Sequence, residues 1–124
     1  MALALYFAAL LAFGIGVVHS VLGERYILTR LFRGGGVPKL FGGTEFTART
    51  LRLAWHITTV AWCGFAALLV YLAQGEASPT SVAKVIGFTF IVTAIVTFVV
   101  SRARHLAWPV FAIIGGIALY VSAT

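Results

Sequence analysis

The chain has 124 residues, of which 61% are hydrophobic and only 10% are charged, and its nine basic and three acidic side chains give a net charge of +6. A mean hydropathy of +1.05 excludes a soluble domain, which needs a polar surface. The single cysteine, Cys63, excludes an intrachain disulfide and any paired-cysteine redox or zinc motif. The composition therefore predicts one integral membrane domain.

Four apolar runs are long enough, or nearly so, to cross a hydrocarbon core about 30 Å thick. None of them alternates apolar with polar residues, and lipid satisfies no backbone hydrogen bond, so each run predicts a helix. The expected spans cover about residues 2–22, 51–73, 82–101 and 106–122. We therefore predict an all-α integral membrane protein in which four transmembrane helices form an antiparallel bundle, as a single domain over residues 1–124.

The first run has no Lys or Arg before Arg25, so it lacks the basic region of a signal peptide and is interpreted as a permanent helix. Small residues recur along it at every fourth position, namely Ala8, Ala12, Gly16 and Ser20. Such spacing allows helix backbones to approach closely. It serves packing inside one bundle, which we favour, or association with a second copy or a partner membrane protein.

The connection after the first run has internal order. Residues 24–33 place apolar side chains on one helical face and arginines largely elsewhere, which predicts a short amphipathic interfacial helix in this first loop. The glycines at 34–36 then break the pattern. The second and third runs are joined by a short loop around residues 74–81, which makes those helices antiparallel neighbours.

Basic side chains mark one side of the predicted bundle. Eight of the nine lie in the first loop or in the connection after the third run, whereas Lys84 lies near the opposite face together with Glu76. The positive-inside rule then places both basic loops in the cytoplasm and both termini outside, in what we expect to be a bacterial cytoplasmic membrane. The charge indicates contact with anionic lipid headgroups and no nucleic-acid partner.

The three histidines are the main candidates for chemistry. His19 lies near the end of the first span, His56 near the start of the second and His105 just after the third. At a rise of about 1.5 Å per residue, these rings and the Glu24 carboxylate share a level near the cytoplasmic face. Imidazoles bind transition metals such as Zn, Cu or Fe, two of them could hold a haem, and a carboxylate could complete such a site. Proton relay is a third use of histidine, which titrates near neutral pH.

Other polar residues extend this candidate site. A polar interior is predicted from hydroxyl side chains on three helices, namely Ser20, Thr59, Thr93, Thr97 and Ser101. Arg49 and Arg52 share a face with His56 and are predicted to bind an anionic lipid headgroup or another anionic ligand. The alternative is purely structural polar packing, in which hydroxyls bond to carbonyl groups of their own helix.

Three functions remain open from the sequence. The first is a membrane protein that binds a metal or haem through His19, His56, His105 and Glu24. The second is a structural or accessory subunit that assembles with itself or with a partner membrane protein. A small transporter is the third, although the acidic residues lie near helix ends or in loops rather than deep in the membrane. Enzymatic activity stays open, but the chain contains no Asp, no GxSxG motif and no phosphate-binding loop.

Overall fold

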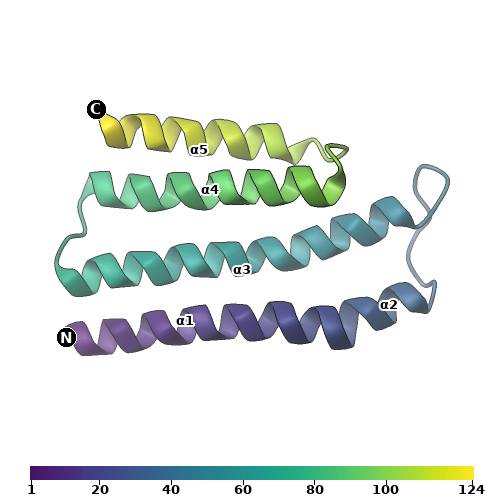
Figure 1. Cartoon of the computed structure of the whole chain (residues 1–124), viewed down its shortest axis with the longest axis horizontal. Helices are drawn as coiled ribbons and strands as arrows, with labels where there is room; N and C mark the ends of the chain where they lie inside the picture. The colour runs from purple at the N-terminus through teal and green to yellow at the C-terminus, as the bar shows by residue number, and fades with distance from the viewer.

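The computed structural model describes residues 1–124 and contains helices but no strand (Figure 1). Helix α1 (Ala2–Leu22) continues through a π-helical segment, η1 (Gly23–Leu28), into the short helix α2 (Thr29–Arg33). Three further helices follow, α3 (Glu45–Gln74), α4 (Pro79–Ser101) and α5 (Ala107–Ala123). The prediction of an all-α membrane protein with four antiparallel apolar helices is confirmed.

Three continuous helices, Ala2–Arg33, Glu45–Gln74 and Pro79–Ser101, are long and apolar enough to cross a membrane. Helix α5 is also apolar, but its 17 residues place it at the short end of the range of about 17–25 that spans a bilayer. The first two helices extend past the predicted spans at the same end of the molecule (Figure 1). We call this end, which carries the 34–44 loop and the turn at residues 102–106, the basic end.

The helices lie side by side in one layer, in the order α1, α3, α4, α5, when the molecule is viewed down its shortest axis (Figure 1). Each helix packs extensively only on the helix that precedes or follows it in this order. Only 14 of the 124 residues are buried, which leaves most large apolar side chains on the two open faces of the layer. Those faces suit a lipid surrounding, because lipid tails solvate apolar side chains.

Small residues set the distance between neighbouring helices. A Cβ atom at Gly115 of α5 would lie 2.9 Å from the Gly87 carbonyl oxygen of α4, so this pair needs glycine. On α1, Gly16 is buried against Thr59 and Trp62 of α3. The predicted small-residue stripe on α1 therefore includes a close contact with α3 inside the chain.

The helix ends follow from local sequence. Helix α3 ends at Gly75, which has a left-handed φ of 74°. Ser78 and Ser81 form a reciprocal capping box at the start of α4, with Pro79 in its first turn. At the basic end, α4 ends at Ser101, and the next two residues, Arg102 and Ala103, are in the left-handed conformation, at φ values of 51° and 62°. These two residues turn the chain sharply into α5.

Candidate functional site

A connected group of polar side chains lies between α1–η1 and α3 at the basic end. Glu24 and Ser20 stand one helical turn apart on one side, and Arg52, His56 and Thr59 share a face of α3 on the other. The two nitrogens of the His56 ring bridge the helices: Nδ1 lies 2.9 Å from the Ser20 hydroxyl, and Nε2 lies 3.3 Å from a Glu24 carboxylate oxygen. We call these five residues the α1–α3 polar site.

The Glu24 carboxylate is held by two cationic partners. Arg52 donates from Nε to one of its oxygens at 2.9 Å and approaches the other with Nη2 at 2.6 Å, which is a bidentate pair. The His56 ring contacts the same carboxylate from the side that faces the membrane interior. The side chains of Glu24, Arg52 and His56 are 35%, 39% and 29% exposed, so the site is only partly buried between the two helices.

The hydroxyl groups extend the site away from the basic end. Thr59 donates its proton to the Gly16 carbonyl at 3.1 Å, so its oxygen accepts from Ser20, which lies 2.7 Å away. Ser20 has only one proton, and it is then used on Thr59. His56 must therefore donate from Nδ1 to Ser20. Donation from Nε2 to Glu24 at the same time requires a ring that carries protons on both nitrogens.

The π-helical segment η1 brings α1 close to α3 at this point. Gly23 opens η1 and is buried, and a Cβ atom there would overlap the Trp55 indole. The indole N–H donates to the His19 carbonyl at 3.0 Å. Single π-helical turns often accompany functional sites. Sequence reasoning missed this segment, although a glycine between an apolar run and an acidic residue, with a Trp on the next helix, was an available signal.

His19 occupies a separate place on the same interface. Its ring stacks on Trp55 at a centroid distance of 4.5 Å and 5° between the planes, and Trp62 covers it at 5.1 Å. The Thr58 hydroxyl lies 3.1 Å from its Nε2 atom. His19 is thus held in an aromatic slot and has no contact with the Glu24 carboxylate.

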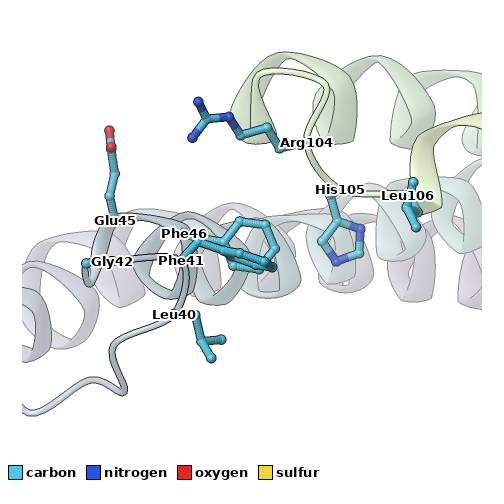
Figure 2. A pocket seen from close by; sticks show the side chains of 9 residues that line it. Leu40, Phe41, Gly42, Glu45, Phe46, Arg104, His105 and Leu106 are labelled. Atoms are coloured by element: carbon cyan, nitrogen blue, oxygen red, sulfur yellow. The ribbon is translucent and has the colours of Figure 1, made fainter.

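His105 lies in the turn between α4 and α5. Its backbone N–H donates to the Ser101 hydroxyl at 3.3 Å, and its Nδ1 atom accepts from the Ala107 N–H at 3.3 Å. The ring lies beside Phe46 in the lining of a hollow at the basic end (Figure 2). His105 therefore caps the start of α5 with one nitrogen and turns the other toward the hollow beside Phe46.

The structure does not bring the predicted metal ligands together. His56 and Glu24 are in contact, but His19 and His105 lie elsewhere, and no group of three or more His, Cys, Asp or Glu side chains could hold a metal ion. Of the three rings, that of His19 stacks on Trp55, the residue before His56, whereas that of His105 lines a hollow with Phe46 near the start of α3. The three rings do not converge, because helix α3 lies between α1 and α4 in the single layer.

The predicted polar interior also divides into two parts. Ser20 and Thr59 belong to the α1–α3 polar site, whereas three hydroxyls of α4 are buried and donate to carbonyl groups four residues earlier in their own helix, at 2.6–2.7 Å, namely Thr93, Thr97 and Ser101. The two predicted anion-binding arginines each have a carboxylate partner within the chain. Arg49 pairs with Glu45 and Arg52 with Glu24.

Residues 48–108 match the family described as "Domain of unknown function (DUF202)", a family of membrane-associated domains. The match covers just under half of the chain, from α3 through α4 to the start of α5. It includes Arg52, His56 and Thr59 but not their partners Ser20 and Glu24. No curated protein and no solved structure shows a significant match to the chain.

Proposed function

We propose that this small integral membrane protein binds and relays protons at the α1–α3 polar site, with its basic end in the cytoplasm. The observation that carries the proposal is the bridging of α1 and α3 by both nitrogens of His56. An imidazole so placed can gain a proton at one nitrogen and release one from the other. The concentration of basic side chains at this end supports the cytoplasmic orientation.

The location of the site supports a functional role. Ionisable side chains within membrane-spanning helices are costly and commonly mark proton relays or transport paths. Glu24 is partly exposed at the basic end and contacts His56, and the other nitrogen of the His56 ring leads on to Ser20 and Thr59. A continuous hydrogen-bonded chain thus runs from Glu24 through His56 and Ser20 to Thr59, whose hydroxyl is anchored on the Gly16 carbonyl.

Loss of a proton from His56 changes the contact between the helices. If Nε2 loses its proton, the ring nitrogen presents a lone pair to the Glu24 carboxylate, and only Arg52 still holds that group. If Nδ1 loses its proton, Ser20 must turn its own proton from Thr59 to the ring. Either change disturbs a hydrogen bond that joins α1 to α3, so proton binding is coupled to helix packing.

The relay can be tested by NMR on the full-length protein in lipid nanodiscs with isotope-labelled histidine. The rate at which ring N–H protons exchange with water is measured for each histidine. We expect Glu24→Gln to slow exchange at His56 on the order of 100-fold, the low end of what a positioned acid–base group contributes. Exchange at His19, observed in the same spectra, stays unchanged because His19 has no contact with Glu24.

Glu45→Gln is the matched control, since it removes a carboxylate at the same end that pairs with Arg49 rather than with His56. The relay is contradicted if the exchange rate at His56 is the same in wild type and Glu24→Gln. It is also contradicted if the rate falls equally in Glu45→Gln.

Metal or haem binding, the first hypothesis from the sequence, gains no support from the positions of the three rings.

An accessory subunit is the second candidate, and the single helix layer favours it. The outer edges of α1 and α5 and both faces of the layer have no protein neighbour within the chain. A second copy or a partner membrane protein would cover them. Chemical crosslinking in native membranes, followed by purification, tests this role. A strictly monomeric protein that co-purifies with no other would remove it.

A further inference from the structure

A hollow of about 770 Å³ lies at the basic end, between the 34–44 loop and the turn that joins α4 to α5 (Figure 2). It is separate from the α1–α3 polar site. Four large apolar side chains, one guanidinium and one imidazole dominate its lining, namely Leu40, Phe41, Phe46, Leu106, Arg104 and His105. The hollow is therefore apolar over much of its wall and cationic at one side.

A smaller hollow of about 80 Å³ adjoins the first and shares Glu45, Phe46 and Arg104 with it. Three guanidinium groups line this second space, from Arg49, Arg102 and Arg104, against the single carboxylate of Glu45. Glu45 is already paired with Arg49, and neither Arg102 nor Arg104 forms an ion pair. Two uncompensated cations therefore stand beside an apolar hollow.

The apolar side chains of the larger hollow are unusually open. Phe41 is 89% exposed and Leu106 is 86% exposed, and both lie in the connections at the basic end. Phe41 lies in the left-handed region with a φ of 53°, a conformation that favours Gly or Asn, and its ring meets Phe46 edge-on at 5.0 Å. Phe41 therefore presents most of its ring to the surroundings of the chain, next to a second aromatic ring.

The His105 ring adds a directed donor. Because its Nδ1 atom accepts from the Ala107 N–H, its neutral form carries the ring proton on Nε2. The ring points into the larger hollow beside Phe46 (Figure 2). The site thus combines guanidinium groups and an N–H donor with exposed aromatic and aliphatic surface, which matches the two halves of an anionic amphiphile.

We propose that this paired hollow binds an anionic phospholipid of the surrounding leaflet. The phosphate lies by Arg102 and Arg104, and an acyl chain covers Phe41 and Leu106. Charge complementarity selects the headgroup, since basic pockets on the cytoplasmic side of membrane helices bind anionic headgroups. The exposed apolar side chains select a lipid over a free phosphate, which could not cover them. The proposal is independent of the proton relay.

Native mass spectrometry of the detergent-purified full-length protein tests the site. Phosphatidylglycerol and phosphatidylcholine with the same acyl chains are titrated separately. We expect preferential retention of phosphatidylglycerol, and an affinity about fivefold weaker for each arginine removed in the double variant R102Q/R104Q. The control R25Q/R33Q removes the same charge at the same end from residues that do not line either hollow, and it should retain the lipid.

Phe41→Asn tests the apolar half, because Asn tolerates the left-handed backbone and removes the ring. We expect it to weaken phosphatidylglycerol binding roughly 10-fold, the effect of losing contact with a large apolar side chain. If R102Q/R104Q fails to fold, the binding of phosphatidylglycerol to Phe41→Asn still tests whether the lipid occupies this hollow. The proposal is overturned if the protein retains both lipids equally, or if R102Q/R104Q and R25Q/R33Q lose the lipid to the same extent. It is also overturned if Phe41→Asn binds phosphatidylglycerol as the wild type does, or if glycerol phosphate alone displaces the lipid.

Discussion

Substitution of Gly23 by Ala tests how closely α1 must approach α3 beside the polar site. The added Cβ would overlap the Trp55 indole, so the ring must move. Its hydrogen bond to the His19 carbonyl and its stacking on the His19 ring are then lost. Each of these interactions contributes about 1 kcal/mol, and Ala regains about 1 kcal/mol through its higher helix propensity. We expect a net loss of about 1 kcal/mol.

Gly14→Ala is the matched control on the same helix, because nothing lies within 4 Å of its added Cβ. Gly14→Ala should be stabilised by about 1 kcal/mol, because Ala has a higher helix propensity than Gly and no contact is lost. The two variants should therefore differ by about 2 kcal/mol in the free energy of unfolding. Reversible unfolding in mixed micelles, followed by tryptophan fluorescence and circular dichroism, measures this difference. Equal stability of the two variants would refute the close contact between Gly23 and Trp55.

Three further substitutions test other contacts through the same unfolding assay. Gly115→Ala places a Cβ 2.9 Å from the Gly87 carbonyl oxygen and should lower the free energy of unfolding by about 1–3 kcal/mol. Gly116→Ala has open space around its Cβ and should not lower it, so equal losses in the two variants would disprove the α4–α5 packing. Ser78→Ala removes the capping box of α4 and should cost about 1 kcal/mol, so an unchanged stability would argue against that cap. Ser20→Ala leaves the His56 Nδ1–H without its acceptor and should cost about 1 kcal/mol; an unaltered Nδ1–H signal in NMR spectra would contradict that bond.

The helices were predictable from the sequence because hydropathy and length alone decide whether a segment can cross a bilayer. Their full extent was less predictable. The second span was expected from about residue 51, yet α3 begins at Glu45. Hydropathy detects only the part of a helix in hydrocarbon, whereas backbone hydrogen bonds continue into the polar region, where charged side chains are tolerated.

The candidate site was predictable only in part. The contact between His56 and Glu24 could be expected from their common depth, and the pairing of Ser20 with Thr59 from the same argument. The separation of His105 could not, because depth along a helix says nothing about which helices are neighbours. A closed bundle would have allowed α1 to meet α4, but the single layer places α3 between them.

Glu24 shows that an acidic residue just after an apolar run can still lie inside a continuous helix and contact the neighbouring helix. The sequence places this carboxylate just after the first apolar run, near a helix end rather than deep in the membrane. In the structure the helix does not end there, since Ala2–Arg33 is continuous and η1 carries Glu24 within it. The π-helical turn and Gly23 bring this stretch against α3, where Arg52 and His56 hold the carboxylate. A helix that continues past its apolar run can thus hold a carboxylate against two cationic groups of the neighbouring helix, and this contact is the one that the proposed proton relay uses.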